Sequence, residues 1–205
     1  MGGICMNFVY LKGIVKNIRY SHTIDDIVFN RAELLVKRPD GTEDILIVKF
    51  KQFSRYFKED SLIELIGNVR SYSQLVDGTH KVEIYVFSYF DEVEIETEDI
   101  TNVVKLDGRI CKKDELRTTT SGKHYIHFII ANNLIVEESQ KLNSYIPCVA
   151  WGKNAKIIRD NYKVGDFLTV EGQLQSRQYK KQTGDDFEIR VAHEVLVKTM
   201  CEVTE

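Results

Sequence analysis

The sequence predicts an all-β protein built from two copies of one five-stranded unit. Its 205 residues include two prolines and twelve glycines, and many short segments rich in Val, Ile, Leu, Tyr and Phe end at turn pairs such as Asp77-Gly78. Such segments are typical of strands joined by tight turns. A second observation is an internal repeat, because the segment from Asn7 to Gly13 returns in similar form from Asn102 to Gly108.

The repeat keeps its order along the chain. An offset of 95 residues relates the first two segments, and an offset of 105 relates Leu62–Ser71 to Phe167–Ser176 and Val82–Ile84 to Phe187–Ile189. The offset grows because the second copy has a longer stretch, Asn132 to Ser144, between its second and third strands. Two copies of one unit therefore explain the length of the chain.

The boundary between the two units is predicted in an acidic segment. Six of the nine residues from Asp91 to Asp99 are acidic and none is basic. Runs of like charge repel one another and usually stay solvated. We therefore expect a first unit at 1–90, a linker at 91–99 that keeps the units apart, and a second unit at 100–205. A segment that attracts basic partners is the alternative interpretation of the linker.

Within a unit, apolar and polar residues alternate along each strand. Val104, Leu106, Gly108 and Ile110 share one face of the strand whose other face carries Lys105, Asp107 and Arg109. One face is therefore expected to be buried and the other exposed to solvent. Glycine inside a strand commonly marks a bulge or a sharp bend, and strongly bent strands close a small barrel. The matched glycines inside predicted strands are Gly13, Gly67, Gly108 and Gly172.

A short helix is predicted between the third and fourth strands. The apolar residues Ala155, Ile157, Ile158 and Tyr162 precede Gly165, and Ile158 and Tyr162 are four residues apart. This spacing indicates an apolar helix face that can cover a barrel end. Five strands with a helix before the fourth is the OB-fold arrangement. The fold class predicted is thus two tandem five-stranded OB-fold barrels, each with a short helix between its third and fourth strands.

The composition excludes several classes of protein. With 43% hydrophobic and 29% charged residues the chain can build a core, and no apolar run approaches the roughly 18 residues of a membrane span. The four cysteines are scattered without a Cys-x-x-Cys pair, which favours free thiols in a reducing compartment over disulfides or a zinc site. We expect a cytoplasmic protein with no cofactor, no metal and no catalytic motif.

Charge and aromatic residues favour a nucleic-acid partner for the second unit. Residues 105–181 hold 14 basic and 8 acidic residues, whereas residues 7–90 hold 12 and 11 and the whole chain carries a net charge of −3. Alternation places Tyr145, Pro147, Val149 and Trp151 on the outer face of the third strand, with Ile146, Cys148 and Ala150 inside. Exposed aromatics that stack bases, combined with cations that follow phosphates, hold single strands without sequence preference.

The candidate DNA-binding residues combine these two features. Tyr179 leaves the fourth strand among Arg177, Lys180 and Lys181, and Tyr72 is a candidate stacking residue of the first unit. Core packing and ordinary solvated side chains are the alternative roles for such aromatics and lysines. The full set is Tyr145, Trp151, Tyr179, Arg177, Lys180, Lys181, Lys105, Arg109, Lys153, Lys112, Lys113 and Tyr72.

The second unit resembles the bacterial single-stranded-DNA-binding proteins, and the first looks like a diverged relative. The matching residues are Asn102, Val104, Leu106 and Gly108 on the first strand, Cys148-Val149-Ala150-Trp151-Gly152-Lys153 and Ala155 on the third strand and helix, and Gly165, Leu168, Val170-Glu171-Gly172-Gln173-Leu174, Ser176-Arg177 and Tyr179 around the fourth. The resemblance also implies that Tyr145, Trp151 and Tyr179 correspond to the base-stacking positions of the family.

The resemblance implies a function and an assembly. It implies sequence-independent binding and protection of single-stranded DNA in replication, recombination or repair, with other replication or repair proteins as further partners. Because the family's working unit gathers four barrels, two barrels per chain imply a homodimer. The alternatives are an adaptor of primosome type that acts through protein contacts, and a single-stranded RNA ligand.

Overall fold

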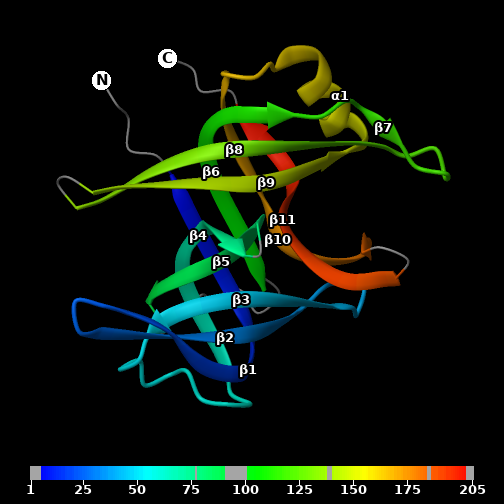
Figure 1. Cartoon of the computed structure of the whole chain (residues 1–205). Helices are drawn as coiled ribbons and strands as arrows, with labels where there is room; N and C mark the ends of the chain where they lie inside the picture. Colours follow the sequence, from blue (N-terminus) through cyan, green and yellow to red (C-terminus); the bar gives the residue numbers. More distant parts are fainter. Residues whose placement is uncertain (1–5, 77, 91–100, 138–139, 184–185, 202–205) are drawn as a thin grey trace.

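The described strands of the protein all belong to one continuous sheet. A computed structural model describes residues 6–76, 78–90, 101–137, 140–183 and 186–201, in which eleven strands and one helix occur (Figure 1). The first half contains β1 (Asn7–Ile24), β2 (Ile27–Lys37), β3 (Glu43–Lys51), β4 (Leu62–Val76) and β5 (Thr79–Phe90). The second half contains β6 (Asn102–Lys113), β7 (Arg117–Thr118), β8 (His124–Glu137), β9 (Gln140–Trp151), α1 (Gly152–Asn161), β10 (Phe167–Thr183) and β11 (Asp186–Cys201).

Strand pairing runs in a ring within each half. In the first half β1 pairs with β2 and β4, β2 with β3, β3 with β5 and β5 with β4. The second half repeats this order with β6, β8, β9, β11 and β10. In both rings one pair is parallel, β3–β5 or β9–β11. The order confirms that the chain is mostly β and that the second half repeats the first, and the two-residue β7 is an addition that the sequence does not predict.

The inward residues of the strands form the core, as their alternation predicts. Val104, Leu106 and Ile110 are fully buried, while Lys105 and Arg109 are exposed. The prediction that Asp107 is exposed is wrong, because its side chain accepts a hydrogen bond from the backbone N–H of Met6 at 2.8 Å and only 8% of the residue is exposed. The stretch from Asn132 to Ser144, expected as a longer connection, extends the hairpin of β8 and β9, in which these two residues lie opposite each other.

The predicted helix exists only in the second half among the described residues. Helix α1 covers the core with Ala155 and Ile158, both buried, and it is neither long nor apolar enough to cross a membrane. The helix predicted for the first half is wrong, because residues 52–61 between β3 and β4 form turns and bends. There the buried ring of Phe57 stacks on Phe50 with ring centroids 3.7 Å apart. One aromatic ring thus packs on the core where the second half uses a helix.

Glycines allow the strands of each ring to approach closely. A Cβ atom would lie 2.4 Å from the carbonyl oxygen of Phe87 at Gly67, and 2.1 Å from that of Leu196 at Gly172. The pairing register shifts at both positions, which confirms the predicted bulges. Gly13 and Gly108 lie similarly close to carbonyl groups of β2 and β8.

The two halves are joined directly through β1 and β6. These strands pair antiparallel with Val9 opposite Val104, Asn7 opposite Leu106 and Leu11 opposite Asn102. Since the repeat offset of 95 relates Asn7 to Asn102 and Leu11 to Leu106, the pairing has the symmetry of a two-fold axis between the two valines. The expectation that a linker keeps the units apart is therefore wrong. The predicted linker itself, residues 91–99, lies outside the described residues.

Equivalent polar contacts repeat on both sides of this axis. The buried amide of Asn7 exchanges hydrogen bonds with the backbone of Val69, at 2.8 Å in each direction. Asn102 does the same with Leu174, at 2.7 and 2.9 Å. Buried amides need such partners, since an unpaired polar group would cost about 1–3 kcal/mol.

A second pair of equivalent contacts joins the halves further out. The backbone N–H of Tyr145 donates to the Ser71 hydroxyl at 2.8 Å, and that of Ile45 donates to the Ser176 hydroxyl at 3.0 Å. These are hydrogen bonds between β9 and β4 on one side and between β3 and β10 on the other. The junction is therefore built largely as a symmetric interface within one chain.

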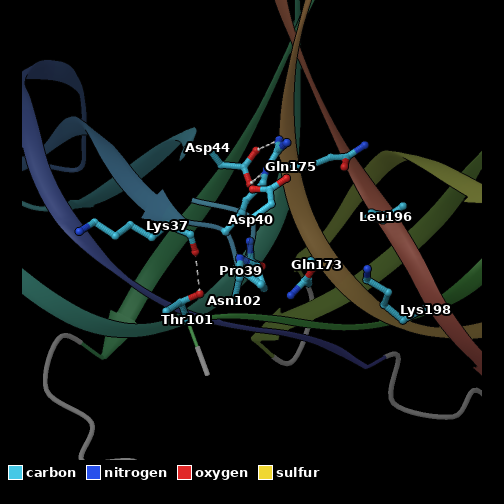
Figure 2. A pocket seen from close by; sticks show the side chains of 11 residues that line it. Lys37, Pro39, Asp40, Asp44, Thr101, Asn102, Gln173, Gln175, Leu196 and Lys198 are labelled. Atoms are coloured by element: carbon cyan, nitrogen blue, oxygen red, sulfur yellow. Dashed lines mark hydrogen bonds and ion pairs between the residues drawn. The ribbon is translucent and has the colours of Figure 1, made fainter. Parts of the chain in front are cut away.

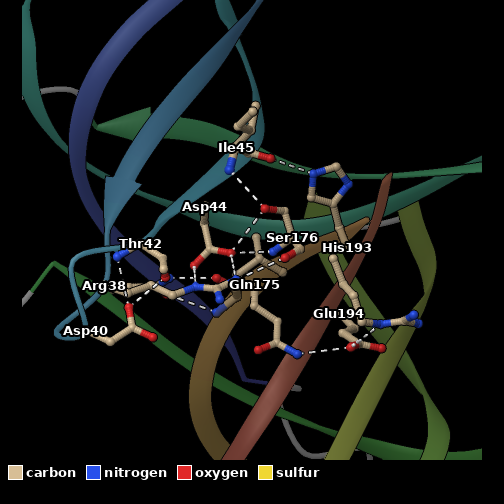
Figure 3. Close-up of polar contacts among 12 residues, drawn as sticks. Arg38, Asp40, Thr42, Asp44, Ile45, Gln175, Ser176, His193 and Glu194 are labelled. Atoms are coloured by element: carbon tan, nitrogen blue, oxygen red, sulfur yellow. Dashed lines mark hydrogen bonds and ion pairs between the residues drawn. The ribbon is translucent and has the colours of Figure 1, made fainter. Parts of the chain in front are cut away.

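Charged groups make one side of the junction different from the other. Figure 3 shows Asp44, which accepts hydrogen bonds from Arg38 and from the backbone N–H and hydroxyl of Ser176. His193 lies beside this cluster, with its Nε2 2.7 Å from the carbonyl oxygen of Ile45. Burial lowers the pKa of His193. A neutral ring with a proton on Nε2 thus donates to that carbonyl.

A cavity of about 360 Å³ lies beside the same cluster, between the two halves. Figure 2 shows Lys37 and Asp40 from the first half lining it together with Gln173, Gln175 and Lys198 from the second. Its lining mixes cations with carboxylates, so it offers no uniform charge to a ligand.

Candidate nucleic-acid interface

The outer face of the second half gathers aromatic and charged side chains from four strands. Inward residues of β8 and β9 such as Ile126 and Ala150 are buried, so their neighbours in sequence point away from the core. Six outward residues of β8, β9, β10 and β11 form the stacking face, as we name it here: Tyr125 and His127 of β8, Trp151 of β9, Glu194 of β11, and Arg177 and Tyr179 of β10.

An aromatic column occupies one end of the stacking face. Tyr125 lies directly opposite Trp151 in the β8–β9 pairing, and their ring centroids are 5.0 Å apart. The ring of His127 meets Tyr125 edge-on at 5.4 Å. Trp151 keeps 40% of its surface exposed, although it packs on Tyr125. An indole held in this way presents a π surface to a base without having to be ordered on binding.

A buried carboxylate connects the column to the cationic end of the face. Glu194 lies 3.5 Å from Nε2 of His127 and 3.4 Å from Nε of Arg177, and it accepts a hydrogen bond from Gln175 at 3.0 Å. Burial opposes the ionisation of Glu194, but the bonds from His127 and Gln175 and the charge of Arg177 outweigh it, so its pKa lies below the ordinary value. Glu194 is thus an ionised anchor at neutral pH.

The other end of the face pairs a guanidinium with a tyrosine. The guanidinium carbon of Arg177 lies 5.8 Å from the ring centroid of Tyr179, within cation–π range. Tyr179 is 38% exposed and lies opposite Arg190 in the β10–β11 pairing. Contacts therefore run without a break from Trp151 through Glu194 to Tyr179.

The remaining predicted aromatics lie apart from this chain of contacts. Tyr145 is exposed on the same strand as Trp151, but six residues away, at the junction with the first half. Pro147 is half-buried, and Val149, predicted to be outward and wet, is only 1% exposed. The prediction that the Val149 side chain is exposed to solvent is wrong. Strands β8 and β11 flank it on both sides, with His127 and Leu196 as its pairing partners.

The predicted lysines and arginines are dispersed. Lys105 pairs with Glu171 at 3.6 Å, Lys112 pairs with Asp114 at 3.6 Å, and Arg109 donates to the carbonyl of Gly165 at 2.9 Å. All three are exposed and belong to β6, which contributes no residue to the stacking face.

Lys113 and the lysines after Tyr179 occupy other surroundings. The ammonium of Lys113 donates to carbonyl groups at the end of α1, those of Arg159 at 3.2 Å and of Tyr162, which directly follows the helix. It therefore stabilises the end of the helix. Lys180 lies on the opposite face of β10 from Arg177 and Tyr179. The side chain of Lys181 lies outside the described residues. Lys153 is exposed in the first turn of α1.

On the corresponding face of the first half, the cations are already paired with a carboxylate. Glu83 binds Arg31 at 3.1 Å and Lys49 at 2.6 Å. The Lys49 ammonium also lies 4.0 Å from the ring centroid of Tyr85 and 5.7 Å from that of Tyr72, which is itself exposed. One carboxylate thus neutralises two cations, and phosphates would have to displace it.

Tyr125, His127 and Glu194 are absent from the set predicted from sequence. The alternation that predicts Trp151 also applies to β8, where the inward Ile126 and Phe128 leave Tyr125 and His127 outward. That signal was present in the sequence. Glu194 has no such local signal, because its partners come from β8 and β10.

Comparison with known proteins identifies relatives of the second half. The Single-strand binding protein family matches residues 101–201. A single-stranded DNA-binding protein of Fusobacterium nucleatum is 36% identical over 85 residues, covering 40% of this chain and 55% of that protein. Single-stranded DNA-binding protein 1 of Streptococcus pyogenes is 37% identical over 87 residues, covering 42% and 66%. The matched segment thus spans between about half and two thirds of these relatives.

Solved structures extend the likeness to both halves. The wild-type single-stranded DNA binding protein from Thermus aquaticus has a TM-score of 0.72 with 19% identity, covering 99% of this chain and 95% of that one. A deletion mutant of the same protein gives 0.73 with 18% identity, covering 100% and 97%. At this level of identity the likeness concerns the fold, and it includes the first half, which the family match does not reach.

Proposed function

Because residues 101–201 belong to the single-strand binding protein family, we propose that this protein binds single-stranded DNA without sequence preference through the stacking face. The observation that carries the proposal is the unbroken chain of contacts from Trp151 to Tyr179. Bases can stack on Trp151 and Tyr179, because every base has a π surface, while Arg177 lies beside the phosphates. None of these contacts reads the edge of a base, so the binding tolerates any sequence.

We assign the main DNA contact to the second half. Its balance of 14 basic to 8 acidic residues over 105–181 attracts phosphate more strongly than the 12 to 11 of residues 7–90. The cations on the matching face of the first half are also held by Glu83. We propose that the first half serves mainly to complete the fold and the assembly, with Tyr72 as a minor contact.

The two rings of strand pairing support the assignment of two OB-fold barrels. We propose domains at 1–90 and 100–205, joined by the acidic segment 91–99. The resemblance to the family supports a role in protecting single strands during replication, recombination or repair in the cytoplasm, with proteins of those processes as partners. These finer roles rest on the family alone.

We also propose a homodimer. Each chain supplies two barrels, and the family's working unit gathers four. Light scattering at micromolar concentration should therefore give twice the 23.8 kDa mass of one chain. A single-chain mass under these conditions would contradict the proposal.

Replacing Tyr179 by Ala should weaken binding to poly(dT) by roughly 1–3 kcal/mol, the contribution of one stacked base. The slope of log affinity against log salt should not change, because every cation that faces a phosphate is still present. Trp151 is the only tryptophan in the chain, so quenching of its emission by the stacked base reports binding directly.

The matched control is Tyr72→Ala, which removes an exposed tyrosine from the first half. Its effect on poly(dT) affinity should be much smaller. If Tyr179→Ala binds as tightly as the parent and added DNA leaves the Trp151 emission unaltered, the stacking face is not the binding site. If Tyr72→Ala weakens binding more than Tyr179→Ala does, the two halves are ranked in the wrong order.

A further inference from the structure

A basic hollow opens beside Trp151, at the end of the stacking face. It has a volume of about 570 Å³, within the range in which protein pockets hold small ligands. Its lining comprises Gly122, Lys123 and His124 from the turn into β8, and Trp151, Gly152, Lys153 and Lys156 from the end of β9 and the first turns of α1. We refer to it as the Trp151 hollow.

Both walls of the Trp151 hollow are held in place. The turn before β8 is closed by hydrogen bonds from Thr119 N–H to the carbonyl of Lys123 at 2.9 Å, and from Lys123 N–H to the Thr119 hydroxyl at 3.0 Å. The start of α1 is anchored by Asn154, whose amide donates to the carbonyl of Lys198 at 2.9 Å. The spacing of the lysines is therefore set by the fold.

Charge in the Trp151 hollow is of one sign. Three lysines and no carboxylate are among the described residues that line it. Within the described ranges, none of Lys123, Lys153 and Lys156 forms an ion pair, whereas the cations on the face of the first half are bound to Glu83. The cavity between the halves has carboxylates among its lining. The Trp151 hollow is thus the better suited of the two to a polyanion.

Building on the proposed function, we propose that the Trp151 hollow receives the phosphodiester backbone next to the base stacked on Trp151. Lys123, Lys153 and Lys156 then face its phosphates. Lys123 and Lys156 lie far apart in sequence and belong to no candidate set from the sequence. The track of the single strand therefore continues beyond Trp151 onto the start of α1.

The indole favours a nucleic acid over an acidic peptide as the occupant. Trp151 belongs both to the aromatic column and to the lining of the hollow. A strand with one base on that ring has its adjoining phosphate within reach of the lysines, so one ligand uses both features. An acidic peptide would use the charge and leave the exposed indole without a role.

The test compares the salt dependence of poly(dT) binding between two double variants. Lys123→Ala/Lys156→Ala removes two cations from the hollow. Lys58→Ala/Lys163→Ala removes two exposed lysines that the repeat relates by its offset of 105 and that line neither cavity. Lys163 lies beyond the far end of α1, about 15 Å from its start at 1.5 Å per residue. Both variants change net charge equally.

The hollow variant should lower the salt slope by about 0.7 for each phosphate that is no longer neutralised, and the control should keep the parental slope. Quenching of Trp151 at saturation should remain, because the ring is intact. Lys123→Arg/Lys156→Arg should restore the slope, since it keeps both charges.

Equal slopes in the two double variants would overturn the assignment while poly(dT) binding by the parent upholds the proposed function. If, in addition, a hexaglutamate peptide bound the parent and not the hollow variant, the hollow would be a protein-docking site and our proposal wrong. A parent that fails to bind poly(dT) would instead refute the proposed function itself.

Discussion

Replacing Gly172 by Ala should destabilise the protein by roughly 3 kcal/mol or more, the upper end of what overpacking costs. The added Cβ would lie 2.1 Å from the carbonyl oxygen of Leu196 and 3.2 Å from the Cα of Val197. Both atoms belong to the backbone of β11, so no side chain can move aside. The variant must push β10 and β11 apart at the bulge that bends them. Urea denaturation followed by circular dichroism measures the decrease in stability.

Gly41→Ala is the control, because it adds the same methyl group in open space. Apart from atoms of Gly41 and its two chain neighbours, no heavy atom lies within 4 Å of the added Cβ. The cost there is the strain of a left-handed backbone with φ of 83°, about 1–2 kcal/mol. If both variants unfold at the same urea concentration, close strand approach at Gly172 does not matter to stability.

Much of the fold follows from local patterns in the sequence. Alternation predicts the buried Leu106 and Ile146 and the exposed Trp151, because the side chains of a strand point to opposite faces in turn. The repeat predicts that the second half copies the first. Alternation is a short-range signal within one strand, and the repeat is found by comparing two segments of the sequence. Neither signal depends on which strands pair.

The errors arise where the outcome depends on tertiary contacts that leave no periodic pattern in the sequence. The first half lacks the predicted helix because Phe57 packs on Phe50, and a buried aromatic in a turn gives no periodic signal. Val149 is covered by strands on both sides, one of which begins 37 residues later at Asp186. The acidic segment suggests separation, yet strand pairing between β1 and β6 holds the halves together.

The candidate site likewise contains some residues that the sequence predicts and others that only the folded structure reveals. Trp151, Arg177 and Tyr179 can be predicted from pattern and resemblance, since each stands out in its own strand. Glu194 can be recognised as part of the site only in the folded chain, where β11 places it between His127 and Arg177. The Trp151 hollow needs the turn at Lys123 and the helix start at Lys153 to meet, and that meeting is a property of the folded chain.

Replacing Asp44 by Ala should destabilise the junction by about 3 kcal/mol. Asp44 is 2% exposed and binds Arg38 as well as the backbone N–H and hydroxyl of Ser176. Breaking a buried ion pair costs about 3–5 kcal/mol, because the remaining charge is left without a partner. The Arg38 side chain is 34% exposed and can be hydrated when its partner is removed. The expected loss of stability therefore lies at the lower end of this range. Thermal and urea unfolding both measure it, and the exposed Asp40→Ala should change little.

A double-mutant cycle separates the ion pair from the other contacts of Asp44. The decrease in stability of Arg38→Ala/Asp44→Ala should be smaller than the sum for the single variants, with a coupling within the roughly 0.5–3 kcal/mol found for residues in contact. Ser176→Ala should couple to Asp44→Ala less strongly, because it removes the hydroxyl but keeps the backbone N–H. Additive effects for Arg38 and Asp44 would mean that the pair contributes nothing to the junction. Since Ser176 directly precedes Arg177 in β10, a loosened junction should also weaken poly(dT) binding, although Asp44 lies outside the stacking face.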